Sequence, residues 1–117
     1  MKILFIINDT PYGTEKAYNA LRLGIQILKD NPGTELNIFL LADAIGCGVA
    51  EQKTPDGYYN IGRMMKIITR EGGKIKVCGT CMDARGINEQ MLQSGVQRSN
   101  LKEFAEWTVE ADKILSF

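Results

Sequence analysis

The chain has 117 residues, of which 14 are basic, 14 are acidic, none is histidine and three are cysteine. A chain of this length can bury its own hydrophobic core, so we expect a single domain over residues 1–117 that needs neither metal nor disulfides for stability. The balanced charge disfavours direct binding to nucleic acid or to an anionic membrane. This balance leaves small molecules or other proteins as the expected partners. The lack of histidine removes the usual general base and metal ligand.

Short apolar runs alternate with amphipathic segments along the chain. The predicted strands cover residues 2–8, 35–41, 74–78, a weak segment around Val96, and 113–117. The predicted helices cover residues 15–31, 59–71, 88–93 and a last helix capped by Ser99 or Asn100. This alternation predicts an α/β fold, a three-layer α/β/α sandwich around a parallel sheet.

Two segments of this pattern suggest contacts outside the core. Residues 42–60 form a long predicted loop with glycines, Cys47 and a Pro-Asp-Gly turn. A loop of this length is too long for a plain connector, so we expect it to cover a site or to contact another subunit. In the last helix, the apolar face is predicted to consist of Leu101, Phe104, Ala105 and Val109.

Reactive groups in parallel sheets gather beyond the carboxyl ends of the strands. That edge should carry Asn8 and Asp9 after the first strand, Asp43 after the second and Cys78 after the third. Aspartates at strand ends are more often turn or helix caps than acids or bases. Cys78 therefore lies where function is expected.

Residues 76–86 read KVCGTCMDARG, and four interpretations fit their cysteine pair. Free cysteine is often simply buried, which applies to Cys47 as well. A Cys-x-x-Cys pair is half of a common zinc site, although only Cys47 remains as a further sulfur ligand. The pair Cys78 and Cys81 also suits a dithiol that closes a redox-active disulfide. Alternatively, Cys78 alone is a nucleophile that accepts sulfur as a persulfide.

The surroundings of Cys78 favour a reactive thiol. The backbone amides of Gly79 and Thr80 and the helical turn that follows are expected to point toward the sulfur, and Arg85 is close in sequence. Amides at a helix start and a nearby cation stabilise a thiolate. We therefore predict that the pKa of Cys78 is lowered.

Three segments resemble the DsrE/DsrF-like family, in particular its small YchN-like members. They are NDTPYGTEKAYNALRLG at 8–24, AIGCGVAEQKTPDGYYN at 44–60 and KVCGTCMDARGI at 76–87, and the similarity extends to EWTVEADKILSF at 106–117. The resemblance implies a five-stranded parallel sheet in the order 4-3-2-1-5. It also implies homo-oligomers, commonly trimers or hexamers.

Some members of this family act in dissimilatory sulfur metabolism, and others relay persulfide sulfur toward thiouridine in transfer RNA. In these sulfur-carrying members, the cysteine that closes the third strand, several residues before an Arg-Gly, receives the sulfur. The matching residue here is Cys78, followed by Arg85 and Gly86. Cys81 falls where the relay proteins often have a small apolar residue, so a disulfide or a resolving role for Cys81 stays open.

The implied strand order places Cys78 away from the topological switch of the sheet, which lies between the first and fifth strands. We therefore expect a pocket at the sheet edge, completed by the 44–60 loop of the same or a neighbouring subunit. The residues expected to line this pocket are Asn8, Asp9, Asp43, Cys47, Gly79 and Thr80.

The leading hypothesis is a cytoplasmic sulfur carrier that accepts sulfane sulfur on Cys78 and passes it to a partner. Arg85 would stabilise the thiolate and Cys81 would resolve or protect the persulfide. The expected partners are sulfur donor and acceptor proteins and further copies of this chain, as a homotrimer or homohexamer, with no cofactor and no metal. The cytoplasm is expected because the odd cysteine count favours free thiols and no secretion signal is recognised.

Two alternatives remain at this point. The first is an oligomeric binding or regulatory module whose cysteines are structural or hold a metal. The second is a dithiol-disulfide oxidoreductase that uses Cys78 and Cys81.

Overall fold

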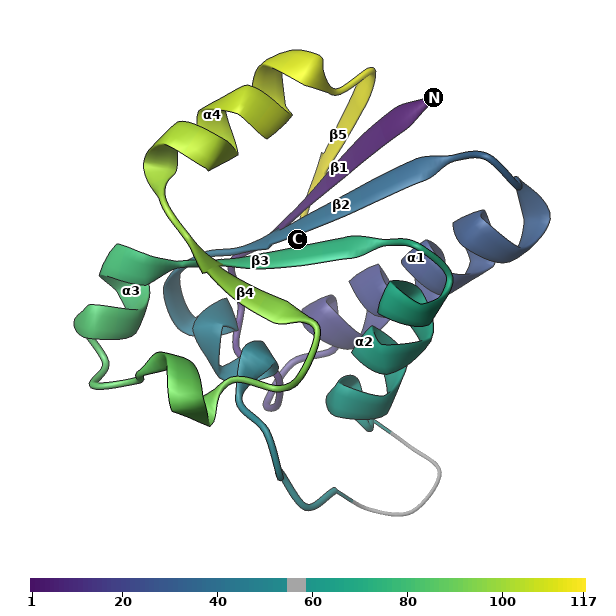
Figure 1. Ribbon diagram of the computed structural model, residues 1–117. Helices are drawn as coiled ribbons and strands as arrows, with labels where there is room; N and C mark the ends of the chain where they lie inside the picture. Colours follow the sequence, from purple (N-terminus) through teal and green to yellow (C-terminus); the bar gives the residue numbers. More distant parts are fainter. Residues whose placement is uncertain (55–58) are drawn as a thin grey trace.

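A five-stranded parallel sheet forms the centre of the computed structural model, which describes residues 1–54 and 59–117 (Figure 1). The strands are β1 (Lys2–Ile7), β2 (Glu35–Leu40), β3 (Lys74–Cys78), β4 (Val96–Ser99) and β5 (Lys113–Ser116). Their order across the sheet is β4-β3-β2-β1-β5, and every neighbouring pair is parallel. The predicted fold class and strand order are therefore confirmed.

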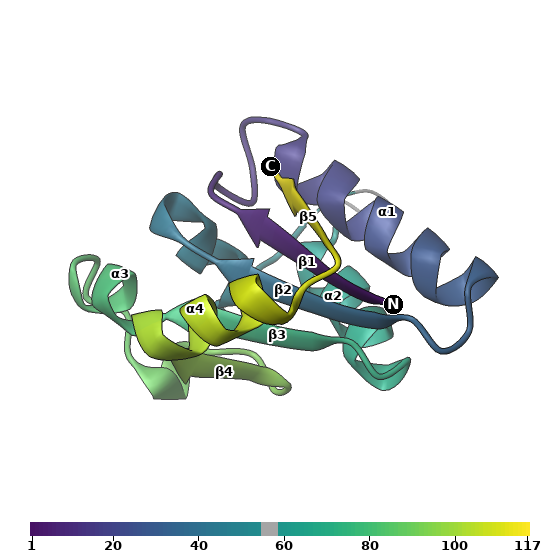
Figure 2. The same cartoon turned by 90° about the horizontal axis from the view of Figure 1, so that it is seen from above.

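The helices lie on both faces of the sheet, with α1 and α2 on one face and α4 on the other (Figure 2). The α-helices are α1 (Lys16–Asp30), α2 (Ile61–Arg70), α3 (Gly79–Asp83) and α4 (Leu101–Glu110). The connections from β1 to β4 all step in one direction across the sheet, whereas the connection through α4 steps back to β5. Because crossovers between parallel strands are right-handed, the returning helix must cover the opposite face.

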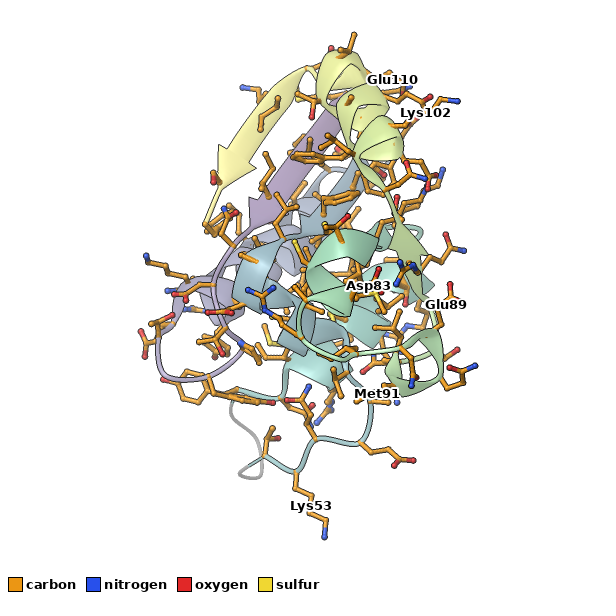
Figure 3. All side chains as sticks on the ribbon, turned by 90° about the vertical axis from the view of Figure 1, so that its left-hand side faces the viewer. Lys53, Asp83, Glu89, Met91, Lys102 and Glu110 are labelled. Atoms are coloured by element: carbon orange, nitrogen blue, oxygen red, sulfur yellow. The ribbon has the colours of Figure 1, made fainter. Side chains whose placement is uncertain are left out.

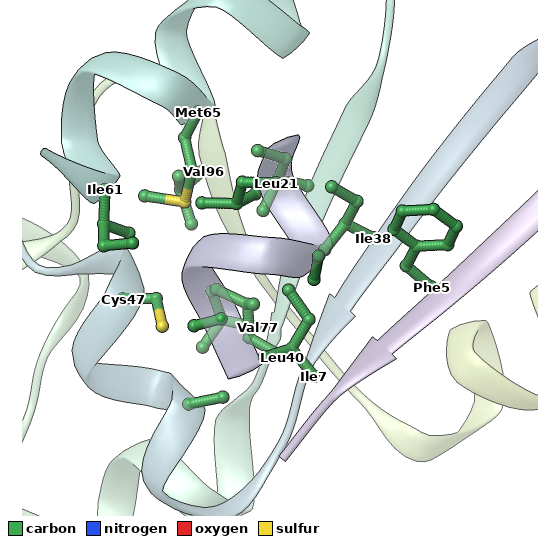
Figure 4. Packing of buried hydrophobic residues seen from close by; sticks show 14 of the residues in the cluster. Phe5, Ile7, Leu21, Ile38, Leu40, Cys47, Ile61, Met65, Val77 and Val96 are labelled. Atoms are coloured by element: carbon green, nitrogen blue, oxygen red, sulfur yellow. The ribbon is translucent and has the colours of Figure 1, made fainter. Parts of the chain in front are cut away.

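The main core lies between the sheet and the α1–α2 layer (Figure 4). Phe5, Ile38 and Val77 point from three neighbouring strands into this core, and all three are fully buried. Gly24 lets α1 approach closely, since a Cβ atom there would lie 3.0 Å from the side chain of Leu36. This dense layer fixes the strands whose carboxyl ends carry the site.

The opposite face is covered more thinly by α4. The Phe104 ring lies 4.5 Å from the ring of Phe39, and the Trp107 ring lies 6.0 Å from it. The predicted apolar face is wrong in part, because Leu101 and Val109 are 76% and 86% exposed. Leu101 and Val109 lie on a neighbouring stripe of α4, whereas Phe104 and Trp107, which was not part of the predicted face, point toward the sheet. Lys102 and Glu110 also project from the outside of α4 (Figure 3).

Two connections differ from the sequence-based expectation. The segment after β2, expected to be a loop, begins with a 3-10 helix, η1 (Ala42–Gly48), in which Ala44, Ile45, Cys47 and Gly48 are buried. The helix expected at 88–93 is a single 3-10 turn, η2 (Glu89–Met91). The predicted Pro-Asp-Gly turn at 55–57 lies outside the described residues.

The carboxyl edge of the sheet is where η1 and α3 come together. Both helices begin directly at or just after a strand end, η1 after β2 and α3 after β3. These two strands are neighbours in the sheet, so the two helix starts lie side by side. Among the described residues, no helix is long and apolar enough to cross a membrane.

Candidate functional site

Cys78 closes β3 and is also the N-cap of α3. Its Sγ atom accepts a hydrogen bond from the backbone N–H of Cys81 at 3.4 Å. Serine, threonine or aspartate usually fills this capping role. A thiol in their place is held over the first turn of the helix. Cys78 is free and partly exposed there.

Cys81 follows one turn later and touches two other groups at the sheet edge. The backbone N–H of Ala42 donates to the Cys81 Sγ atom at 3.4 Å. Ala42 has a φ of 49°, in the left-handed region that residues other than glycine seldom adopt. The side chain of Cys81 also lies close enough to the Cys78 thiol to influence its pKa. The two sulfurs thus form one dithiol site at the start of α3.

The pKa of Cys78 is raised, mainly because burial disfavours the charged form. The side chain of Cys81 raises it further, while the backbone amides of Cys81 and Thr80 lower it. The prediction that backbone amides favour the thiolate is therefore right for the amides of Thr80 and Cys81. The predicted net direction is wrong, because burial and the second thiol outweigh the amides.

Arg85 joins α3 to η1. Its Nε and Nη2 atoms donate to the Asp43 carboxylate at 3.1 and 2.9 Å, and its Nη1 atom donates to the Cys81 carbonyl at 3.1 Å. The guanidinium group is thus engaged by a carboxylate and a carbonyl, which hold α3 against the start of η1. Arg85 has a positioning role in this structure, and a direct effect on the Cys78 thiolate stays a prediction.

Arg98 on β4 is a site residue that the sequence analysis missed. Its Nη1 and Nη2 atoms donate to the two carboxylate oxygens of Asp83, both at 2.9 Å. A Cβ atom on Gly79 would lie 2.9 Å from the Arg98 guanidinium, so the glycine is needed for this close approach. The pKa of Arg98 is raised mainly by Asp83 and, to a smaller extent, by Glu89 and Cys78. Figure 3 labels Asp83 and Glu89, which mark the surroundings of Arg98.

The signal that could have found Arg98 is strand pairing. Residues Cys78 and Ser99 lie opposite each other across β3 and β4. Arg98, the residue before Ser99, must then lie beside the Cys78–Gly79 turn. Sequence distance hides this relation, because a whole crossover separates the two strands.

Asn8 and Asp9, also expected in the pocket, serve the β1 side of the edge instead. Asn8 Nδ2 donates to Ser116 Oγ at 3.2 Å and ties β1 to β5. The Asp9 carboxylate accepts from Thr10 N–H at 2.9 Å and from Thr14 Oγ1 at 2.7 Å. The hydrogen bond from Thr14 is the main reason that the pKa of Asp9 is lowered. Asp9 therefore caps a turn, as the sequence favoured.

Cys47 belongs to the core and not to a pocket. It lies among the core side chains (Figure 4) and is 1% exposed, and its thiol donates to the Asp9 carbonyl at a sulfur–oxygen distance of 3.9 Å. Burial raises the pKa of Cys47 to about 12. Placing Cys47 in the substrate pocket was wrong, because η1 turns its side chain inward. Within the described ranges, no three His, Cys, Asp or Glu residues are grouped so that they could hold a metal ion.

Of the six residues expected in one pocket, Asp43, Gly79 and Thr80 lie together at the sheet edge. Cys78, Gly79, Thr80 and Cys81 form one cluster, and Asp43 joins it through Arg85. A separate cavity of about 480 Å³ lies on the β1 side and receives residues from the long segment after η1. Its lining consists of Pro11, Tyr12, Gly13, Thr14, Glu15, Lys53, Thr54 and Tyr59.

These features define a class: a small parallel α/β protein with a free dithiol at the carboxyl edge of its sheet. The sequence model of the DsrE/DsrF-like family matches residues 1–117, and the chain belongs to this family. It is 41% identical to protein YchN of Escherichia coli over 116 residues, which are 99% of this chain and 98% of YchN. It is also 35% identical to the uncharacterized protein MJ0989 of Methanocaldococcus jannaschii, over the full length of both chains.

Solved structures show the same fold. The crystal structure of YchN from E. coli matches with a TM-score of 0.94 and covers 100% of this chain and 99% of that one. The structure of MTH1491 from Methanobacterium thermoautotrophicum matches with a TM-score of 0.77 at 13% identity. It covers 99% of this chain and 98% of that one, and at this identity the likeness concerns the fold alone.

Proposed function

We propose that the chain is a cytoplasmic sulfur carrier that holds sulfane sulfur as a persulfide on Cys78. The observation that carries the proposal is the placement of Cys78, a partly exposed thiol at the N-cap of α3 beside a second thiol. Membership of the DsrE/DsrF-like family supports the same chemistry. A cysteine with only a structural role would lie as deep as Cys47 does.

The loading step is a transfer between sulfurs. Cys78 Sγ attacks the outer sulfur of a donor persulfide, R–S–SH; the S–S bond of the donor breaks, and R–S⁻ leaves. The proton of the Cys78 thiol ends on the leaving R–S⁻, which departs as the thiol R–SH. Delivery to the thiol of an acceptor protein follows the same steps with the roles exchanged.

The proposed partners are sulfur donor and acceptor proteins and other copies of this chain, as a homotrimer or homohexamer. Exposed apolar side chains support an assembly, since Leu101 and Val109 on α4 and Ile114 on β5 are 76%, 86% and 46% exposed. The molecular mass in solution, measured by light scattering, tests this part of the proposal. A monomer at micromolar concentration would contradict it.

The function is tested by exposing the reduced protein to a persulfide donor and measuring its intact mass. We expect Cys78 to gain one sulfur atom, an increase of about 32 Da, and Cys78→Ala to lose that gain. Cys47→Ala is the matched control and should label like the wild type. Equal labelling of wild type and Cys78→Ala would rule the proposal out.

A dithiol oxidoreductase is the second candidate, favoured by the placement of both free thiols on the first turn of α3. It predicts a reversible Cys78–Cys81 disulfide with substrates that contain no sulfane sulfur. The same intact-mass measurement separates the two functions. An oxidoreductase loses about 2 Da on turnover with a disulfide substrate and never gains sulfur.

A further inference from the structure

The Cys78–Cys81 pair is arranged for more than sulfur storage. Cys78 Sγ caps the amide of Cys81 at 3.4 Å, so the Cys78 sulfur is held above the turn from which the Cys81 side chain projects. The two cysteines stand at the N-cap and at the third residue of α3. This one-turn spacing is the one from which Cys-x-x-Cys pairs close a disulfide.

The Cys81 sulfur is the acceptor at the centre of this arrangement. It receives the Ala42 amide N–H at 3.4 Å. This hydrogen bond fixes the Cys81 sulfur at the sheet edge, one helical turn after Cys78. The Ala42 donor is fixed in place, because Arg85 ties Asp43 of η1 to the Cys81 carbonyl.

We propose that Cys81 attacks the Cys78 persulfide and releases its outer sulfur as hydrosulfide, which makes the chain a sulfane-sulfur reductase. The inference rests on the proposed function, because it needs the persulfide on Cys78. It gives the loaded sulfur a second exit besides transfer to an acceptor thiol.

The reaction is balanced within the dithiol. The Cys81 thiolate attacks Cys78 Sγ, a new Sγ–Sγ bond forms, and the bond between Cys78 Sγ and the sulfane sulfur breaks. The sulfane sulfur takes the electron pair and leaves as HS⁻, and the two cysteines are oxidised to a disulfide. A protein or small molecule with a dithiol then reduces the disulfide and restores the starting state.

The third cysteine cannot take this role. Cys47 is buried in the core, its pKa is raised to about 12, and its thiol donates to the Asp9 carbonyl. Its removal should leave hydrosulfide release unchanged. Cys47→Ala is therefore the background that simplifies every mass measurement.

The test compares wild type, Cys81→Ser and Cys81→Ala, all in the Cys47→Ala background. Each reduced and desalted protein is treated with glutathione persulfide without oxygen, desalted again and followed over time. Intact mass reports the persulfide and the disulfide, and a colorimetric assay reports sulfide. Circular dichroism confirms that both variants fold. Sulfide that glutathione itself releases from the persulfide is common to all three samples and cancels in the comparison.

The expected result is a persulfide that lasts at least about tenfold longer in both Cys81 variants than in the parent. The parent should end about 2 Da below the reduced protein and release about one extra sulfide per chain. A persulfide equally long-lived in all three proteins would overturn the inference and leave the proposed function standing. Movement of the added sulfur to Cys81 would also overturn it, since the attack would then be on the outer sulfur. Failure of the Cys81 variants to gain sulfur would overturn both.

Discussion

Two thiol environments lie within one small molecule, and they differ in burial and in hydrogen-bond partners. Cys47 is enclosed by the core, with burial raising its pKa to about 12. Cys78 and Cys81 lie partly exposed at the start of α3, and each sulfur accepts a hydrogen bond from a backbone amide. The difference arises from the elements that carry them. The 3-10 helix η1 turns its cysteine inward, whereas α3 begins with its cysteines at the sheet edge.

The largest expected effect is on alkylation of Cys47. Its pKa rises from an ordinary value of 9.0 to about 12 in the folded chain. The thiolate fraction therefore falls about a thousandfold at neutral pH, and the rate of reaction with iodoacetamide should fall at least as much relative to the unfolded chain. Peptide mapping by mass spectrometry, with and without urea, measures the rates for all three cysteines.

Cys78 is the internal control for this measurement. It should label in the native protein at a rate much closer to its rate in urea. If Cys47 labels natively as fast as Cys78 does, η1 opens readily and the contrast between the two environments is lost.

The second expected effect is on stability at alkaline pH. Because the folded-state pKa of Cys47 lies above its unfolded value, the folded state keeps the proton more tightly. The resulting stabilisation is complete below about pH 9 and is lost as the pH rises toward 12. Between about pH 8 and pH 10.5 the wild type should lose about 2 kcal/mol that Cys47→Ala does not lose.

Urea unfolding of the two proteins at both pH values measures this difference. The variant starts from a lower stability because it leaves a small cavity in the core. Groups that do not interact with Cys47 cancel in the comparison; Tyr12 is the exception, because Cys47 contributes to its raised pKa. Parallel pH profiles for the wild type and the variant would show that Cys47 is not buried as described.

The sequence predicted the fold better than the site. Strand positions follow from short apolar runs such as residues 2–8, and the strand order came from the family resemblance. The position of Cys78 at the sheet edge follows directly from its place at the end of β3. The strand positions and the place of Cys78 depend on local patterns, which one sequence contains in full.

The remaining site features depend on tertiary contacts. Cys47 was placed in a pocket because η1 looked like a loop, and nothing in its residues shows which way a 3-10 turn faces. Arg98 reaches the Cys78–Gly79 turn only through the pairing of β3 with β4. The raised pKa of Cys78 reflects burial and its contact with Cys81, which sequence spacing does not measure.

The third effect concerns the coupling inside the dithiol site. The side chain of Cys81 raises the pKa of Cys78, whereas its backbone amide lowers it. Removing the side chain in Cys81→Ala should therefore lower the pKa of Cys78 and speed its alkylation at neutral pH several-fold, by roughly three- to tenfold. The pH profile of alkylation, in the Cys47→Ala background, gives the measurement. An unchanged or upward-shifted profile would contradict the contact between the two thiols.

The smallest effect distinguishes the two arginines near the site. Arg85 is held by Asp43 and by the Cys81 carbonyl, whereas the Arg98 charge interacts with Cys78 across the Gly79 turn. Arg98→Gln should therefore slow alkylation of Cys78 at neutral pH by about twofold, because a nearby cation favours the thiolate. Gly79→Ala should also slow the alkylation of Cys78. The added Cβ atom would lie 2.9 Å from the Arg98 guanidinium and would displace it.

Arg85→Gln is the matched variant, because it removes the same charge from the neighbouring helix. The structure predicts a smaller change in the Cys78 rate for this variant than for Arg98→Gln, measured by the same pH profile. The opposite order would restore Arg85 as the cation that stabilises the thiolate, which is the role that its place in the Arg85–Gly86 motif first suggested. Cys47 should show no change in either variant, because its high pKa has burial as its main cause.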